Sequence, residues 1–503
     1  MGIVRRLFLF VILVFSFSVY AQEATLQDRY KEFVEKARSA YNSHKEDNIK
    51  SYRAFRDEMN VKYADFISLA WTLYKSKPAI PIPYEEPVVP PQPIPDTFLV
   101  SLPQQPIPLP HDVVVDTPQP IEQPKPIVPI YEDAQSRENW FNFVFYGTNC
   151  KVRIDDRHRF TIASIDESSI AQQWSDCCSG FFDNLIRDCL ALRLSLNLCD
   201  YAYLQMLDAL SDQYFGKDTN ESVFLMSFLY CQSGYKMRFG KSGNNRLVMF
   251  FSSRHTIFRQ SYYEIDGEKF YAYNATDEDC YISSASYENE QPMSLIINYL
   301  PRFEMQTTDA RKIYSHRFPD ISLAVTVNKN LIDFYNTYPV SQYSNDKMTQ
   351  WAIYANTPVS DVVKQTLYIP MKQKLEGLSL VDAVSRILNW VQTGLEYRVD
   401  NEVWGTERAF FMDETLYYPY CDCEDRAILF ARMVRDLLGL EAVLVYYPNH
   451  LATAIEFTDV VSGDYFDFDG RKFVVCDPTY IGASIGMTMP RMNNVTAKLI
   501  KLK

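Results

Sequence analysis

The chain has 503 residues, enough for two or three domains, and 47% of them are hydrophobic, which is ample for buried cores. Its formal net charge is −13, and its lysines and arginines are scattered without forming a basic stripe. A protein that binds the phosphate backbone of a nucleic acid usually carries the opposite charge. The composition therefore predicts a folded protein with no nucleic-acid partner.

The first 21 residues have the pattern of a secretory signal peptide. Arg5 and Arg6 give the charged start, Leu7–Val19 is the apolar stretch, and Val19-Tyr20-Ala21 offers a cleavage site before Gln22. The apolar stretch is short for a transmembrane helix, and no second run of about 18 apolar residues follows it. We therefore expect an exported protein, periplasmic or extracellular, without a transmembrane segment once the signal is removed.

Residues 22–77 predict a helical segment. Aromatic and apolar residues recur there at helical spacing, for example at Tyr52, Phe55, Met59, Tyr63 and Phe66. Such a stripe is more often a packing face than a ligand site. Because the neighbouring sequence offers no obvious partner, we expect the segment to fold back as a hairpin or to bind another protein.

Residues 78–130 form the clearest linker in the chain. Seventeen of the 27 prolines lie between Pro78 and Pro129. A segment this rich in proline favours the extended polyproline II conformation and does not build a core. We interpret it as a spacer, in preference to a recognition motif.

Residues 131–345 predict a mixed α+β domain. The expected elements are strands at 143–146, 150–154 and 247–252, helices at 170–192, 200–214 and 220–234, and a hairpin that turns at Asp266-Gly267. The order of helix, glycine, two strands and Asp-Gly hairpin recurs near the C-terminus, where the hairpin turns at Asp469-Gly470. Two interpretations follow: a diverged and catalytically silent copy of the C-terminal fold, or an unrelated α+β domain.

The last domain, residues 346–503, contains a thiol, an imidazole and a carboxylate in an order that suits nucleophilic catalysis. Cys423 stands at the head of an apolar-periodic helix, His450 follows a strand, and Asp477 ends another strand. His450 is the only histidine that follows Cys423 in the sequence. A cysteine nucleophile needs a base that takes its proton and a third group that orients the base. We predict these three roles for Cys423, His450 and Asp477.

The position of Cys423 also bears on its reactivity. Asp422 is a good N-cap residue just before it, and Gly439 fits the stop of the same helix. The unpaired N–H groups at a helix N-terminus favour a thiolate over a thiol. We therefore expect the pKa of Cys423 to lie below the value of about 8.5 that a free cysteine has.

The sequence motifs in this domain are Cys423-Glu424-Asp425-Arg426-Ala427, a helix that ends at Gly439-Leu440, a strand to His450, and a strand to Asp477-Pro478-Thr479. Together they resemble the transglutaminase-like superfamily of papain-like cysteine enzymes, over roughly residues 375–485. The resemblance implies an α+β core in which the nucleophile helix packs on an antiparallel sheet carrying His450 and Asp477. This superfamily includes transglutaminases, peptide N-glycanases, and bacterial peptidases and amidases, which act on amide bonds through a thioester.

The chain departs from the family pattern at two places, and both bear on the subfamily and the substrate. Cys421 stands where a glycine is common, two residues before the nucleophile. Leu451-Ala452-Thr453 follows His450, where an aromatic residue is frequent.

The cysteines allow other interpretations. Cys421, Cys423, Cys476 and His450 offer the ligands of a Cys₃His zinc site, although the C-x-C spacing is less usual than C-x₂₋₄-C. The ten cysteines of an exported chain also permit one or two disulfides.

Two functions remain. We favour an exported cysteine enzyme that cleaves or transfers amide bonds of peptides or proteins through a thioester, without a metal or cofactor. The alternative is a catalytically inactive transglutaminase-like protein that binds or assembles other proteins of the cell envelope.

Overall fold

The computed structural model describes residues 50–83, 107–119, 139–243, 245–273 and 277–503, with isolated positions between 35 and 47 and at 124. The expected signal peptide at 1–21, most of the expected linker and the first half of the expected helical segment lie outside the described residues. Within the described ranges, no helix is both long enough and apolar enough to cross a bilayer.

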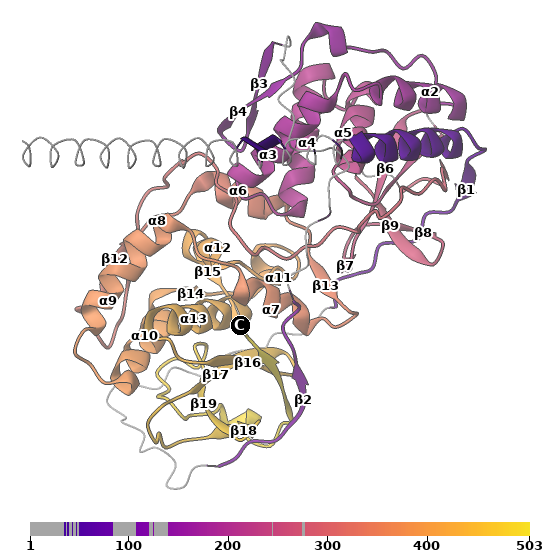
Figure 1. Ribbon diagram of the computed structural model, residues 1–503. Coiled ribbons are helices and arrows are strands. Elements are labelled where there is room, and N and C mark those ends of the chain that lie inside the picture. The colour runs from indigo at the N-terminus through magenta and orange to yellow at the C-terminus, as the bar shows by residue number, and fades with distance from the viewer. Residues whose placement is uncertain are drawn as a thin grey trace, which may run out of the picture.

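The described structure has two lobes, each built around a six-stranded sheet (Figure 1). The strand order is β1-β10-β5-β6-β9-β8 in the N-terminal lobe and β18-β19-β17-β16-β20-β2 in the C-terminal lobe. All pairs within both sheets are antiparallel except β2 with β20. The mixed α+β architecture with antiparallel sheets confirms that part of the predicted fold class.

The N-terminal lobe contains β1 (Thr72–Tyr74), β3 (Trp140–Phe145), β4 (Thr148–Arg153), α2 (Glu167–Cys177), α3 (Asp183–Ser195), α4 (Asp200–Phe215), α5 (Asn220–Gln232), β5 (Met237–Lys241), β6 (Leu247–Ser252), β8 (Tyr262–Ile265), β9 (Glu268–Ala272) and β10 (Cys280–Ile282). The expected strands, the helices at 200–214 and 220–234, and the Asp266-Gly267 hairpin are confirmed. The helical pattern expected over 170–192 is confirmed as two helices, α2 and α3, which the chain separates around Gly180 with a positive φ of 88°.

Elements outside the two six-stranded sheets include β7 (His255–Ile257), β11 (Arg311–Tyr314), β12 (Ser322–Val325), α6 (Lys329–Thr337), β13 (Ser341–Tyr343), α7 (Met348–Asn356), α8 (Asp361–Val363), α9 (Ile369–Leu375), α10 (Leu380–Gly394), β14 (Glu396–Tyr397), α11 (Asp400–Val403), α12 (Met412–Tyr417) and β15 (Tyr420–Cys421). The C-terminal lobe is completed by α13 (Cys423–Leu438), β16 (Ala442–Tyr447), β17 (His450–Glu456), β18 (Tyr465–Phe468), β19 (Arg471–Cys476), β20 (Ala497–Lys501) and β2 (His111–Val115).

The C-terminal sheet is buried on both faces, which fixes its position beneath α13. On one face, Leu444 and Leu451 join the large core that includes Ile428 and Leu429 of α13. On the other face, side chains such as Val445 belong to a second core closed by residues 480–492. Each fully buried aliphatic side chain contributes roughly 1.5–3 kcal/mol. The head of α13 is therefore held firmly against the strands that follow it.

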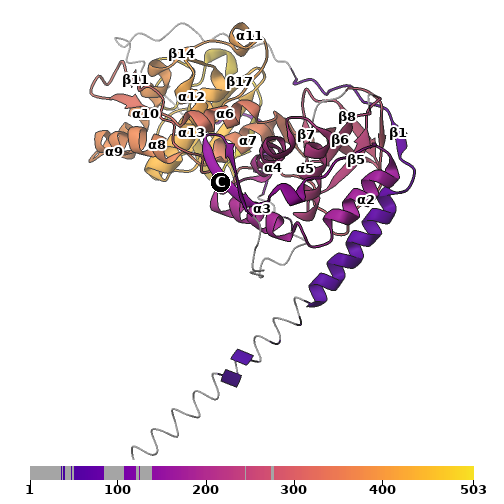
Figure 2. The same ribbon diagram turned by 90° about the horizontal axis from the view of Figure 1, so that it is seen from above.

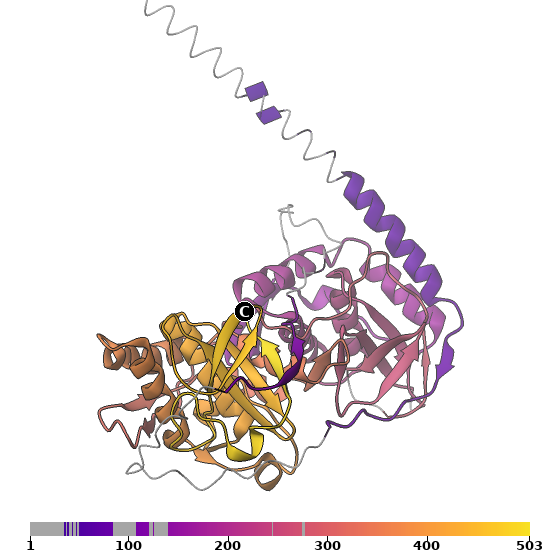
Figure 3. The same cartoon turned by 90° about the horizontal axis from the view of Figure 1, so that it is seen from below.

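The spacer interpretation of residues 78–130 is wrong for one part of the segment. His111–Val115 forms β2, which pairs in parallel with β20 at the edge of the C-terminal sheet (Figures 1 and 3). Val115 is buried there against the core. The run His-Asp-Val-Val-Val lacks proline and carries three β-branched residues, so it can donate ladder hydrogen bonds and pack as a strand.

The expected helical segment also packs differently from expectation. Its described helical part, residues 50–67, lies alongside α2 (Figure 2), where the Tyr63 and Trp174 rings are 4.6 Å apart. Tyr63 and Met59 are buried, whereas Phe55 and Phe66 of the proposed stripe are exposed. The partner of this helix is thus the N-terminal lobe itself, and the chain then leaves the helix to form β1 within that lobe's sheet.

Candidate active site

Cys423 is the first residue of α13, as the sequence predicted. Asp422 takes the N-cap position, and the Asp425 carboxylate accepts hydrogen bonds from the N–H groups of Asp422 (3.3 Å) and Phe410 (2.8 Å). Gly439 ends the helix with a φ of 68°, the left-handed conformation that suits glycine. The backbone N–H of Leu451 in β17 hydrogen bonds to the Cys423 sulfur. This contact ties the thiol to the strand that begins with His450.

His450 and Asp477 form the predicted pair. His450 is the first residue of β17, and Asp477 directly follows β19, the neighbouring strand. The His450 Nε2 atom lies 2.9 Å from Asp477 Oδ2, and both side chains are buried. The other oxygen of Asp477 accepts hydrogen bonds from the N–H groups of Thr479 (2.8 Å) and Tyr480 (3.2 Å). The carboxylate is therefore fixed, and it fixes the imidazole in turn.

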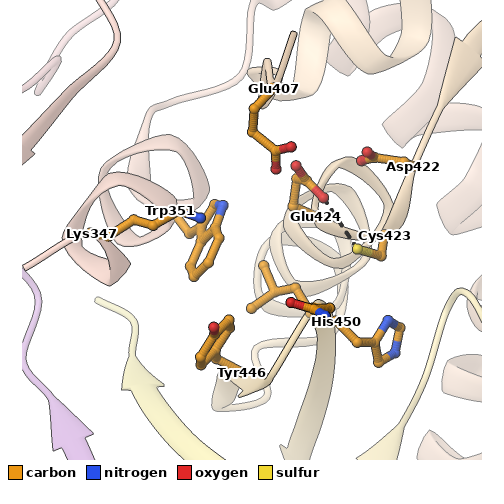
Figure 4. Close-up of a pocket in the computed structure, with 10 residues that line it drawn as sticks. Lys347, Trp351, Glu407, Asp422, Cys423, Glu424, Tyr446 and His450 are labelled. Carbon is orange, nitrogen blue, oxygen red and sulfur yellow. Dashed lines mark hydrogen bonds between the residues drawn. The ribbon is translucent and has the colours of Figure 1, made fainter. Parts of the chain in front are cut away.

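The thiol does not hydrogen bond to the imidazole in this arrangement. Cys423 Sγ instead donates to Glu424 Oε2 at 3.2 Å. The Nδ1 atom of His450 is buried and has no hydrogen-bond partner among the described residues. Both side chains nevertheless line the same small cavity, on the same side of it (Figure 4). The structure thus pairs two of the three predicted residues and brings the third beside them.

The expectation of a lowered thiol pKa is wrong for this arrangement. Burial, followed by the charges of Glu424 and Asp422, raises the pKa of Cys423 well above its usual value. The hydrogen bond from the Leu451 N–H lowers the pKa of Cys423, as a helix N-terminus would, but this effect is smaller than that of burial and the two acids. The Cys423 side chain therefore rests as a neutral thiol, which is a poor nucleophile.

The carboxyl groups responsible belong to a cluster that we did not predict. Asp400, Glu407, Asp422, Glu424 and Asp425 form overlapping groups of three whose ligand atoms lie within 4.8 Å of one another, and one such group includes the Cys423 sulfur. Burial, then the neighbouring charges of Glu424 and Asp425, raises the pKa of Asp400 to about 10. The motif Asp-Cys-Glu-Asp was the available signal, since it places three acidic residues around one thiol.

Within this cluster, Glu424 is the residue that keeps its charge. Burial acts to raise the pKa of Glu424, but its contacts with Asp422, Glu407 and Cys423 outweigh burial and lower that pKa below its usual value. The pKa of Asp422, in contrast, is raised well above its usual value by burial and by Glu424. One carboxylate thus carries the negative charge nearest to the thiol, and a neighbouring acid holds a proton.

The cavity beside Cys423 has a volume of about 20 Å³, room for one small polar group. Figure 4 shows the carboxyl groups of Glu407 and Glu424 on one side and Trp351 and Tyr446 on another. The rings of Trp351 and Tyr446 stack with their centroids 5.4 Å apart. Lys347 lines the far end, where its Nζ lies 5.3 Å from the centroid of the Trp351 ring. Acidic and aromatic walls therefore enclose the approach to the thiol.

Gln392 of α10 is a further residue of the site that sequence reasoning missed. Its buried amide nitrogen donates to the carbonyl oxygens of Asp477 (3.0 Å), Tyr480 (2.9 Å) and Ala483 (3.2 Å). These bonds hold the turn that carries Asp477. A lone glutamine on a helix gives no signal of such a role in the sequence, because its partners are backbone atoms about 90 residues away.

The remaining cysteines support neither the zinc site nor the disulfides. Cys421 and Cys476 are buried, and Cys421 Sγ donates to the Glu396 carbonyl oxygen at 3.8 Å. In the described part of the chain, none of the groups able to hold a metal ion combines Cys421, Cys476 and His450. All ten cysteines lie in that part, and all ten are free thiols.

Comparison with known proteins adds nothing to this geometry. No family model matches the chain, and a search of curated proteins finds no similar sequence.

Proposed function

We propose that the chain is a cysteine enzyme that cleaves or transfers amide bonds of peptides or proteins, with a transglutaminase-like arrangement of Cys423, His450 and Asp477. The observation that carries the proposal is the buried His450–Asp477 pair, which faces the cavity lined by a cysteine at the head of a helix. A histidine held by a carboxylate beside a thiol is the constellation that nucleophilic catalysis requires. The proposal includes export, which rests on the first 21 residues alone.

The reaction begins when the thiol turns from Glu424 to His450. Cys423 gives its proton to His450 Nδ1, and its sulfur attacks the carbonyl carbon of the amide. The new S–C bond forms, the C–N bond breaks, and His450 returns the proton to the leaving amine. Water then attacks the thioester and regenerates the thiol, with His450 passing the proton of the water to the sulfur. An amine in place of water completes a transfer.

The N–H groups near the sulfur suit the negative charge of the tetrahedral intermediate. The backbone N–H of Cys423 lies at the N-terminus of α13, where it has no intrahelical acceptor. Donors of this kind stabilise developing charge on the carbonyl oxygen. Asp477 keeps the imidazole oriented throughout, and Gln392 keeps the turn of Asp477 in place.

A peptidyl acyloxymethyl ketone, which alkylates thiols activated for acyl transfer, tests this proposal. We expect one label per chain, on Cys423, and none after Cys423→Ala. Cys421→Ala is the matched control, since that thiol is buried two residues away and should not matter. Labelling of Cys421, or equal labelling of the Cys423→Ala variant, would contradict the assignment.

The alternative function, an inactive binding or assembly protein, has one observation in its favour. The thiol is held by Glu424 and its pKa is raised by burial, as in a site that no longer reacts. Under this alternative, the probe would label none of the cysteines in the correctly folded protein.

A further inference from the structure

Glu424 holds the thiol in a position that keeps it from the base. The thiol donates to Glu424 Oε2, and the His450 Nδ1 that should receive its proton has no partner among the described residues. A thiol is a weak hydrogen-bond donor. A stronger donor that reached Glu424 would therefore displace it.

The other oxygen of Glu424 is ready for such a donor. Glu424 Oε1 and Asp422 Oδ1 are buried, and apart from the protons of the neighbouring acids, neither has a hydrogen-bond donor within the described residues. A buried carboxylate oxygen left without a donor costs free energy. The cavity in front of these two atoms has room for one small group. The charge of Glu424 is thus met by a weak thiol donor and by neutral acids, and a donor with a positive charge would match it better.

The surrounding contacts favour an organic cation over a metal ion. Calcium takes six to eight oxygen ligands. Of the neighbouring acids, Asp425 already accepts two backbone N–H groups, and Asp400 accepts the N–H of Arg408. These two acids already satisfy backbone donors, so the acids next to the thiol offer fewer open oxygens than the six to eight that calcium takes. An ammonium group needs only a few acceptors, and it forms the strong, charge-assisted hydrogen bonds that a thiol cannot.

We propose that Glu424 determines the specificity of the site: it holds the Cys423 thiol at rest and exchanges it for a cationic group of the substrate. The inference rests on the proposed function. A protonated amine next to the reacting amide, as in a basic peptide, binds Glu424 and Asp422. The released thiol turns to His450 Nδ1, so binding of the matching substrate completes the catalytic pair.

The charges that face this position come from three elements. Glu424 and Asp422 lie at the start of α13, Glu407 lies in the loop before α12, and Lys347 stands at the start of α7. Lys347 opposes an incoming cation, but it lines the far end, beyond Trp351 (Figure 4). The charge nearest to the thiol remains that of Glu424.

Small methanethiosulfonate reagents of different charge test the inference without knowledge of the substrate. Each transfers its thioalkyl group to the cysteine sulfur and releases methanesulfinate, so the reagents differ mainly in the charge they bring. The rates at Cys423, mapped by mass spectrometry on the full chain, are compared for the aminoethyl (cationic), methyl (neutral) and sulfonatoethyl (anionic) reagents. We expect the cationic reagent to exceed the anionic one by about tenfold or more, as a unit charge a few ångströms away dictates.

Glu424→Gln is the decisive variant, because it keeps the shape and removes the charge. We expect the cationic preference to fall severalfold and the rate with the neutral reagent to rise. Glu376→Gln removes the same charge at an exposed position away from the cavity and should behave as the wild type. A urea unfolding curve shows whether each variant is folded. If Glu424→Gln proves unfolded, Trp351→Leu in the wild-type background should lower the same preference, because it removes the aromatic wall.

Three results would overturn the inference. The first is an unchanged charge preference in folded Glu424→Gln, and the second is a slower reaction of that variant with all three reagents. The third is protection of Cys423 by millimolar calcium chloride that EDTA reverses, which would assign the cavity to a metal ion. The proposed function fails separately, if His450→Ala leaves the rate with the neutral methyl reagent unchanged in the Glu424→Gln background.

Discussion

The two lobes have sheets of the same strand order, although the edge strand β1 is antiparallel to its neighbour β10 and the edge strand β2 is parallel to β20. They differ in the residues at the positions of the candidate site. In each lobe a helix precedes two paired strands, an Asp-Gly hairpin adds two more, and the last strand returns to the other side. Strands β8-β9-β6-β5-β10-β1 thus correspond in order to β18-β19-β17-β16-β20-β2. A shared strand order is what the diverged-copy interpretation of residues 140–300 predicts, and that interpretation stays a prediction beside the unrelated α+β domain.

The positions that correspond in strand order carry different residues in the two lobes. Asn220 heads α5 as Cys423 heads α13, and it accepts a hydrogen bond from Leu247 N–H (2.9 Å) at the start of β6. Leu451 N–H makes the equivalent contact with the Cys423 sulfur. The residue before each leucine is Arg246 in one lobe and His450 in the other.

The third pair of corresponding residues follows the second strand of each Asp-Gly hairpin. Tyr273 comes directly after β9, as Asp477 comes directly after β19. Tyr273 donates from its hydroxyl to Asp208 of α4 at 3.2 Å, whereas Asp477 holds His450. The N-terminal lobe thus has Asn220, Arg246 and Tyr273 at the positions that hold the thiol, imidazole and carboxylate in the C-terminal lobe.

The substitution that should distinguish the two lobes most strongly is removal of the proposed general base, His450. We expect His450→Ala to slow acyl transfer to Cys423 by about 10²–10⁴-fold, the usual contribution of a general base. Arg246→Ala, the same change at the corresponding position, should leave the rate unchanged, since that side chain pairs with Asp218 of its own N-terminal lobe. Stopped-flow measurement with an activated ester compares the two. Equal effects of the two substitutions would contradict the assignment of His450 as the general base.

Removal of the orienting carboxylate should have a smaller effect. Asp477→Asn should slow acyl transfer less than His450→Ala does, because Asp477 touches the imidazole and not the sulfur. Its matched control is Tyr273→Phe, which removes the hydroxyl that binds Asp208 and should not change the rate. The pH profiles of the two variants, measured in the same assay, separate loss of orientation from loss of folding. A larger effect for Tyr273→Phe would show that the N-terminal lobe takes part in the reaction.

The turn of Asp477 provides a stability prediction. Gln392→Met leaves three buried carbonyl oxygens without their donor, and we expect a loss of about 1–3 kcal/mol in the free energy of unfolding. Gln373→Met on the exposed side of α9 is the control and should change little. Urea unfolding of both variants gives the difference. Equal midpoints would mean that the turn is held by other contacts.

The smallest expected effect is a pH dependence in the N-terminal lobe. Burial, then the charge of Asp212, raises the pKa of Asp208 to about 7. The folded state keeps this proton while the unfolded state loses it at about pH 4, so stability falls as the pH rises from about 4 to 7. Asp208→Asn removes this loss and should flatten the pH dependence of the unfolding midpoint over that window. A steeper dependence in the variant would contradict the assignment.

The sequence predicted the parts of the site that local patterns determine. The start of α13 at Cys423, its stop at Gly439 and the placement of His450 and Asp477 at strand ends all follow from capping residues and strand periodicity. Such patterns also gave the Asp-Gly hairpins in both lobes. They depend on neighbours along the chain, so one sequence is sufficient to detect them.

Features that depend on distant residues could not be predicted in this way. Asp400 and Glu407 reach Glu424 only because the loop before α12 folds over the head of α13. The Cys423 thiol hydrogen bonds to Glu424 and not to His450, and the side-chain rotamer that decides this cannot be read from the spacing of residues in the sequence. Likewise β2 pairs with a strand at the far end of the chain, where Val115 meets Ile500. No local pattern connects them.

The central claim is that Cys423 forms a thioester with the help of His450. The most direct measurement is a single turnover with p-nitrophenyl acetate, quenched in acid, with the acetyl group located by peptide mass spectrometry. We predict a burst of one nitrophenolate per chain and an acetyl group on Cys423, with a much slower burst in His450→Ala. Acetylation of Cys423 at the same rate in both proteins, or no acetyl group on Cys423 in the folded wild type, would contradict the account.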